Sequence, residues 1–317
     1  MLKDVHVVLR SVGERTAGVA RRLARAQLTS DVDITLVNEA PFETALRATY
    51  LAGLRAGKKW TMTLDADVLV LPSAIATLLA EAEAMPSHYF QTQGRVFDKI
   101  TGTYRSAGPR VYRTDLLRCA IENIPEPSAE LRPEFFVLDR LAKSGHPFRG
   151  VGAVAGLHDY EQFYGDLYRK SFVHAKKHTF LVSAIVQRCA PRLHSDRDFL
   201  AILKGVWDGL LHDGPVAIDA RKFDASIARA LAELALEEKR EILDEETFVK
   251  TFPLSVEEII GKRPIPDYRA TDMPALEKRP ASAIEKARER IKKLGVARGT
   301  AASFGGLLKY CGRLLDA

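Results

Sequence analysis

Through residue 97, apolar runs of strand length alternate with amphipathic segments of helix length, and few folds accommodate that alternation. The strand-like runs are rich in apolar and β-branched residues and cover residues 5–9, 32–37, the run that begins at 60, and 88–97. The segments between them have helical periodicity and cover residues 16–27, 41–57 and 72–84. This spacing predicts βαβ units and a mostly parallel sheet, in which right-handed crossovers bring the carboxyl ends of the strands to one edge.

The third strand-like run ends in two carboxylates, Asp65 and Asp67. Residues i and i+2 of an extended chain point to the same side, so we expect the pair to project together from the edge where open α/β sheets bind ligands. Two close carboxylates repel unless a proton or a cation lies between them, and oxygen ligands suit Mg²⁺ or Mn²⁺. A helix cap plus a solvated aspartate would also explain this short motif. Ser11, Asn38 and Glu39 converge on the same predicted edge, which favours a metal ion that holds a diphosphate.

Composition narrows the class of protein. The chain has 317 residues, enough for one large domain or two ordinary ones, and 46% of them are hydrophobic, which supports a packed core. A net charge of +6 suits an anionic ligand or membrane surface and is too diffuse to indicate nucleic-acid binding. The three cysteines lie far apart, as expected in a reducing cytoplasm. Without a membrane-spanning run or a signal peptide, we expect a cytoplasmic protein, with peripheral contact at the inner face of the membrane left open.

From about residue 160 the strand-like runs stop and helical periodicity takes over. The expected helices cover residues 161–188, 196–211 and 225–243, with one more near the end of the chain. Residues 262–280 are proline-rich and charged, which indicates a linker or a surface arm. Residues 304–315 carry an apolar stripe at helical spacing, flanked by Lys309 and Arg313. That stripe suits contact with a membrane that carries lipid-linked sugars, or packing on the same protein or in a homodimer.

The order of elements in residues 4–160 resembles the nucleotide-sugar half of GT-A-fold glycosyltransferases, family-2-like. The strand that ends Leu64-Asp65-Ala66-Asp67 is similar to that family's Asp-x-Asp motif. The segment from Gly108 to Asp115 is similar to its glycine-led strand that passes into a helix, and Pro133 to Gly145 is similar to its acidic acceptor-side helix.

This resemblance implies a Rossmann-like α/β fold, with a mostly parallel sheet flanked by helices and a mainly helical C-terminal region. It implies a nucleotide-sugar-binding and catalytic GT-A domain at residues 1–160 and a helical, acceptor-side region at 161–260. A linker and an amphipathic helix would then follow at 261–317.

The resemblance also implies roles for individual residues. His158 stands where many of these enzymes place a third metal ligand, and an imidazole favours Mn²⁺ over Mg²⁺. The candidates for the nucleotide pocket are Ser11, Glu14, Asn38 and Glu39, beside Asp65.

Two further roles complete the expected site. Glu134 is the expected general base of an inverting transfer, with Asp139 behind it, although Asp139 also suits a solvated helix face. Lys177 belongs to a cationic run after His158 that would close over the diphosphate as a lid, or would form a solvated basic face of a helix.

We therefore expect a metal-dependent, hexosyltransferase-like glycosyltransferase. It would move a sugar from a nucleoside-diphosphate sugar to a surface polysaccharide, a lipopolysaccharide or another glycan or lipid-linked acceptor. One alternative is a nucleotidyltransferase that makes a nucleotide-sugar, but residues 10–15 contain one glycine where such an enzyme needs a glycine-rich phosphate loop. Another is a non-catalytic nucleotide-sugar-binding module, which the presence of both aspartates disfavours. A Rossmann dehydrogenase is disfavoured because no Gly-x-Gly-x-x-Gly follows the first strand.

Overall fold

The computed structural model describes residues 2–216, 218–261 and 265. The described chain divides into two compact units. The first comprises residues 2–163, 216, 218–225, 238–261 and 265, and the second comprises 164–215 and 226–237. The expected linker at 262–280 and the apolar stripe at 304–315 lie outside the described residues, apart from residue 265.

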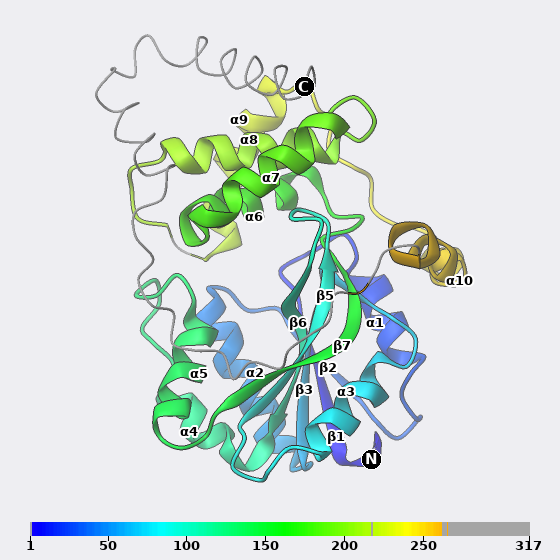
Figure 1. The fold of residues 1–317 in the computed structure, drawn as a ribbon, viewed down its shortest axis with the longest axis vertical. Helices are drawn as coiled ribbons and strands as arrows, with labels where there is room; N and C mark the ends of the chain where they lie inside the picture. Colours follow the sequence, from blue (N-terminus) through cyan, green and yellow to red (C-terminus); the bar gives the residue numbers. More distant parts are fainter. Residues whose placement is uncertain (1, 217, 262–264, 266–317) are drawn as a thin grey trace. The chain divides into compact units, whose positions relative to one another are not determined.

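A seven-stranded sheet in the order β2-β1-β3-β6-β5-β7-β4 forms the first unit (Figure 1). Its strands are β1 (Val5–Arg10), β2 (Ile34–Val37), β3 (Trp60–Asp65), β4 (Val68–Val70), β5 (Gln91–Asp98), β6 (Tyr104–Arg113) and β7 (Phe148–His158). Strands β1, β2, β3, β5 and β7 run in one direction, whereas β6 and β4 are antiparallel to their neighbours. The predicted α/β class with a mostly parallel sheet is confirmed.

The sheet is strongly curled, because β3 and β4 are joined only by Ala66 and Asp67 although β6, β5 and β7 lie between them in the sheet order. Four interstrand spacings in a flat sheet would separate the two strands by about 19 Å, whereas this link can span roughly 11 Å. The curl therefore brings the carboxyl end of β3 close to that of β7, the neighbour of β4.

Helices cover both faces of this sheet (Figure 1). They are α1 (Ala17–Arg25), α2 (Phe42–Ala56), α3 (Ala74–Glu83), α4 (Leu117–Glu122) and α5 (Pro133–Lys143), and α10 (Glu245–Val256) packs against α1. Helix α2 ends where Gly57 takes a left-handed conformation, with φ of 62°. Helix α5 begins at Pro133, in the first turn, where the missing N–H costs no hydrogen bond.

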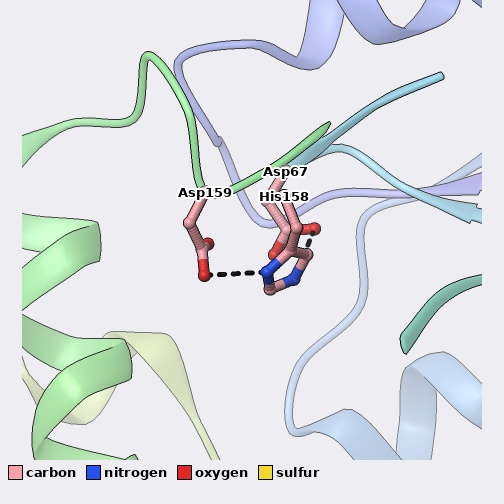
Figure 2. Close-up of side chains that lie close together, drawn as sticks. All are labelled: Asp67, His158 and Asp159. Atoms are coloured by element: carbon pink, nitrogen blue, oxygen red, sulfur yellow. Dashed lines mark ion pairs between the residues drawn. The ribbon is translucent and has the colours of Figure 1, made fainter. Parts of the chain in front are cut away.

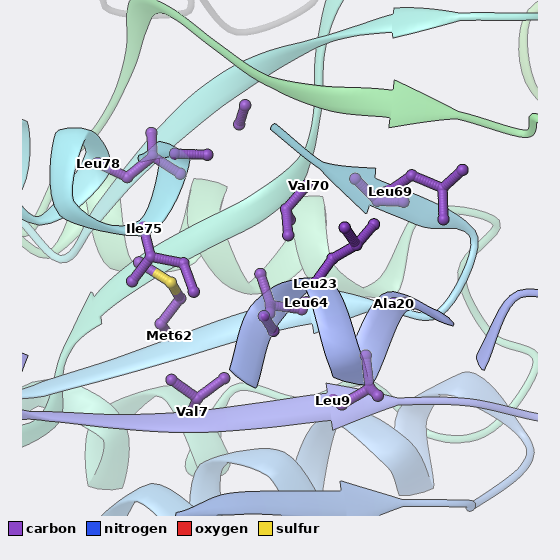
Figure 3. Close-up of a cluster of buried hydrophobic side chains, with 14 of the residues drawn as sticks. Val7, Leu9, Ala20, Leu23, Met62, Leu64, Leu69, Val70, Ile75 and Leu78 are labelled. Carbon is purple, nitrogen blue, oxygen red and sulfur yellow. The ribbon is translucent and has the colours of Figure 1, made fainter. Parts of the chain in front are cut away.

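Alternation along the strands assigns each side chain to one face. Val7 and Leu9 of β1, like Met62 and Leu64 of β3, are buried against α1 and α3 (Figure 3). Val8, between Val7 and Leu9, packs instead with residues of α2. Strand residues of even number in β1 and of odd number in β3 therefore face the side of α2 and α5.

The second unit is helical, with α6 (Tyr164–Lys177), α7 (Val182–Cys189), α8 (Asp198–Leu211) and most of α9 (Asp224–Glu233). Helices α6 and α8 approach closely at Gly205, which has no side chain. A Cβ at this position would lie 2.2 Å from the Tyr168 carbonyl oxygen. The single helix expected over 161–188 is two helices, since the backbone of His178 leaves the helical conformation. Among the described residues no strand follows His158, so the predicted helical region is confirmed.

No helix within the described ranges is long and apolar enough to cross a membrane.

Candidate functional site

The five strands that run in one direction deliver their last residues to one edge of the sheet. Arg10 of β1 is in register with Asp65 of β3 and with Val37, the last residue of β2. At the other side of the curled sheet, Asp98 of β5 is in register with His158 of β7. Ligands bind at such carboxyl ends in open α/β sheets, so this edge is the candidate site.

Asp67, His158 and Asp159 form a cluster at this edge (Figure 2). One ligand atom from each residue can be chosen so that all lie within 4.8 Å of one another. His158 Nε2 is 3.7 Å from Asp67 Oδ1, and His158 Nδ1 is 2.9 Å from Asp159 Oδ2. The backbone aligns them, because β4 pairs with β7 directly after Asp67 and the Asp159 N–H donates to the Asp67 carbonyl at 3.0 Å.

A buried carboxylate, Asp98, lies against His158. Its Oδ2 is 2.8 Å from His158 Nδ1 and accepts a hydrogen bond from Arg105 Nε at 2.7 Å. Its Oδ1 accepts from the Thr101 N–H at 2.7 Å, and the Asp98 side chain is 0% exposed. Nδ1 therefore faces both Asp98 and Asp159, whereas Nε2 faces Asp67. A proton on Nδ1 would leave Nε2 as the ligand atom, as in carboxylate–imidazole–metal arrangements.

The charge balance of this cluster is set by three carboxylates around one imidazole. Burial lowers the pKa of His158, but the negative charges of Asp159 and Asp67, with hydrogen bonds to Asp159 and Asp98, raise it to about 10. Without a bound metal ion the imidazole is therefore protonated, although the guanidinium of Arg105 lies against Asp98, and a divalent ion would supply the positive charge instead. Two carboxylates and an imidazole nitrogen fit Mn²⁺ or Mg²⁺, and the nitrogen favours Mn²⁺.

Asp65 lies outside that cluster. The chain turns at Ala66 and Asp67 and does not stay extended. The expectation that Asp65 and Asp67 project together required an extended chain, so it does not apply here. Asp65 Oδ1 accepts a hydrogen bond from Arg10 Nε at 2.7 Å, and its Oδ2 is 3.7 Å from Arg110 Nη1. The alternation along β3 explains this, because odd-numbered residues face α2 and α5.

The expected base Glu134 is buried in the first turn of α5. It accepts hydrogen bonds from Arg10 Nη1 at 3.3 Å and from the Tyr112 hydroxyl, and Arg110 Nη2 lies 3.0 Å from its other oxygen. Asp139 lies on the same helix and pairs with Lys143 at 2.5 Å.

The expected nucleotide residues lie on two neighbouring loops. Ser11 Oγ donates to Glu14 Oε2 at 2.7 Å, and the same oxygen accepts the Val12 N–H at 2.8 Å. Asn38 and Glu39 are exposed after β2, beside that loop, because the Ser11 N–H donates to the Val37 carbonyl at 2.9 Å. The expected lid residue Lys177 ends α6, in the second unit.

Sequence reasoning missed Asp98, Arg105 and Asp159 as parts of the site. Asp98 had a signal, since it directly follows the strand-like run that ends at Phe97, as Asp65 follows Leu64. Asp159 was visible as the neighbour of His158, but nothing local distinguished it from a surface carboxylate. Arg105 had no local signal, because its role depends on the partner that β6 brings to it.

Comparison with known proteins finds likenesses among solved structures. No protein-family model matches the chain, and no curated protein matches it. Among solved structures it is similar to a glycosyltransferase involved in the glycosylation of the major capsid of PBCV-1, with 13% identity and a TM-score of 0.35, over 46% of this chain and 80% of that one. It is similar to a mannosyltransferase from Pyrobaculum calidifontis in complex with GDP-Man and Mn²⁺, with 13% identity and a TM-score of 0.34, over 80% of each chain. It is also similar to CMP:2-keto-3-deoxy-manno-octonic acid synthetase complexed with CTP, with 13% identity and a TM-score of 0.32, over 49% of this chain and 93% of that one.

Proposed function

We propose that this chain is a metal-dependent glycosyltransferase that moves a sugar from a nucleoside-diphosphate sugar to a glycan or lipid-linked acceptor. The observation that carries the proposal is the cluster of Asp67, His158 and Asp159, with ligand atoms within 4.8 Å of one another, at the carboxyl edge of an α/β sheet. The proposed acceptors are a surface polysaccharide or a lipopolysaccharide. The proposed location is the cytoplasm or the inner face of the membrane.

In this proposal Asp67, His158 and Asp159 hold Mn²⁺ or Mg²⁺, with Asp98 orienting the imidazole. When bound, the ion would act as a Lewis acid toward the leaving diphosphate. The nucleotide side of the site is formed by Ser11, Glu14, Asn38 and Glu39. Asp65 stands between these residues and the metal cluster. Lys177 is assigned, as a proposal, to closure over the diphosphate.

The general base is a separate question. The sequence favours Glu134, with Asp139 second, and both carboxylates have cationic partners: Lys143 for Asp139, and Arg10 and Arg110 for Glu134. The proposed function therefore rests on the metal cluster and not on an identified base.

A nucleotidyltransferase uses backbone N–H groups of its first loop to bind phosphates. Here the carboxylate of Glu14 already accepts the Val12 N–H at 2.8 Å and the Ser11 hydroxyl at 2.7 Å. A backbone N–H of this loop is therefore already bonded within the protein, which favours sugar transfer over nucleotidyl transfer.

Calorimetric titration of UDP and GDP, with and without Mn²⁺, tests the proposal. We expect one nucleotide to bind only with the metal, and Asp67→Ala to abolish that binding. The matched control is Asp115→Ala, which removes a carboxylate that is 69% exposed, and binding should be unchanged. If neither nucleotide binds under any metal condition, the proposal is wrong.

A further inference from the structure

Two arginines and two carboxylates form a closed ring of ion pairs beside the metal cluster. Arg10 Nε donates to Asp65 Oδ1 at 2.7 Å, and Arg10 Nη1 donates to Glu134 Oε1 at 3.3 Å. Arg110 Nη2 is 3.0 Å from Glu134 Oε2, and Arg110 Nη1 is 3.7 Å from Asp65 Oδ2. Each carboxylate thus has both arginines as partners, and the Tyr112 hydroxyl also donates to Glu134.

Exposure is graded around this ring. The side chains of Arg10 and Glu134 are 5% and 9% exposed, Arg110 is 15% exposed, and Asp65 is 26% exposed. Glu134 therefore lies at the buried end and Asp65 at the open end, two residues before the metal-site residue Asp67. A ligand that arrives at the strand edge meets Asp65 first.

The hydrogen bonds of Glu134 bear on its role. Both oxygens are engaged, Oε1 by Arg10 and Tyr112 and Oε2 by Arg110. A general base has to lie within about 2.6–3.2 Å of the substrate hydroxyl whose proton it takes. A substrate hydroxyl would have to compete with two guanidinium groups and a phenol for the oxygens of a side chain that is 9% exposed.

We propose that Glu134 is a positioning residue and not the proton acceptor: through Arg10 and Arg110 it fixes the carboxylate of Asp65 at the open edge of the site. Resting on the proposed function, Asp65 then accepts hydrogen bonds from hydroxyl groups of the nucleotide-sugar. Glu134 acts on ligand binding without touching the ligand. The fork of each guanidinium suits this task because it bonds two carboxylates at once in a fixed geometry.

The test compares Glu134→Gln, Asp65→Asn and the double variant by calorimetry with the nucleotide that binds wild type in Mn²⁺. Glutamine keeps the shape but turns one acceptor into a donor, which breaks the ring. We expect Glu134→Gln and Asp65→Asn each to weaken binding by about tenfold or more, the effect of losing one charge-assisted hydrogen bond. The double variant should bind no more weakly than the weaker single variant, because the residues act as one unit.

A base would behave differently, since Glu134→Gln would leave binding unchanged and abolish only transfer. Unchanged binding, or fully additive losses in the double variant, would overturn the inference alone. Absence of nucleotide binding in wild type would overturn the proposed function and this inference together. Glu122→Gln, on the exposed surface of α4, is the matched control. Should Glu134→Gln fail to fold, Arg110→Lys replaces it, because Arg110 contacts both carboxylates from the rim, and unchanged binding in that variant would equally overturn the inference.

Discussion

Replacing Asp98 by asparagine should reduce metal binding although Asp98 is not among the three cluster residues. Asparagine keeps the size of the side chain but has one acceptor oxygen and one donor amide. The carboxylate it replaces faces donors on both oxygens, from Thr101 on one and from Arg105 and His158 on the other. Whichever way the amide is turned, its N–H₂ group meets a donor.

The size of the effect follows from burial. Asp98 is 0% exposed and pairs with Arg105, so removal of its charge should lower the free energy of unfolding by about 3–5 kcal/mol, the cost of breaking a buried ion pair. Nδ1 of His158 would keep Asp159 Oδ2 at 2.9 Å but lose the buried carboxylate of Asp98 at 2.8 Å, so the ring orientation is less firmly fixed. Loss of such an orienting partner lowers metal affinity by roughly 10–100-fold.

Two measurements check this prediction: denaturant unfolding gives the stability change, and Mn²⁺ titration under conditions where the variant is folded gives the affinity. Asp115→Asn, at an exposed carboxylate, is the control and should change neither quantity. If folded Asp98→Asn binds Mn²⁺ as tightly as wild type, then Asp98 does not orient His158 for metal binding.

Two further predictions concern the second unit. Gly205→Ala should destabilise this unit by about 1–3 kcal/mol, because the new Cβ would lie 2.2 Å from the Tyr168 carbonyl oxygen and would force α6 and α8 apart. Loss of helical circular dichroism on heating measures the destabilisation. An unchanged melting temperature would show that the helices are less closely packed. Burial lowers the pKa of Lys204, but hydrogen bonds to Asp208 and Glu233 raise it by more, above its ordinary value of 10.5. The ion pairs of Lys204 are therefore complete at neutral pH and up to about pH 10.5, and they are lost as pH rises through the raised pKa. Lys204→Ala should therefore destabilise the protein at neutral pH, and the stabilities of variant and wild type should converge in strong alkali. A difference between variant and wild type that did not depend on pH would contradict this.

Local patterning was enough to predict much of the fold. The apolar runs and helical periodicity before residue 97 correspond to β1, β2, β3 and β5 and to the helices between them. This works because side-chain direction repeats every two residues in a strand and every 3.6 in a helix, so burial on one face leaves a trace in the sequence. The ends of the strand-like runs point to Asp65 and His158. They also point to Asp98 when the residue directly after the run that ends at Phe97 is included.

The partners of those residues depended on tertiary structure. Two residues separate β3 from β4, yet the sheet order sends β4 to pair with β7, which brings Asp67 to His158. The antiparallel strand β6 carries Arg105 to Asp98 and Arg110 to Asp65 and Glu134. Strand order and register are set by contacts between residues far apart in the chain, and short-range periodicity contains no record of them. The sequence by itself therefore determined that Asp65 and Asp67 reach the edge of the sheet. Only the tertiary structure, through strand order and the curl of the sheet, decided that Asp67 meets an imidazole while Asp65 meets two arginines.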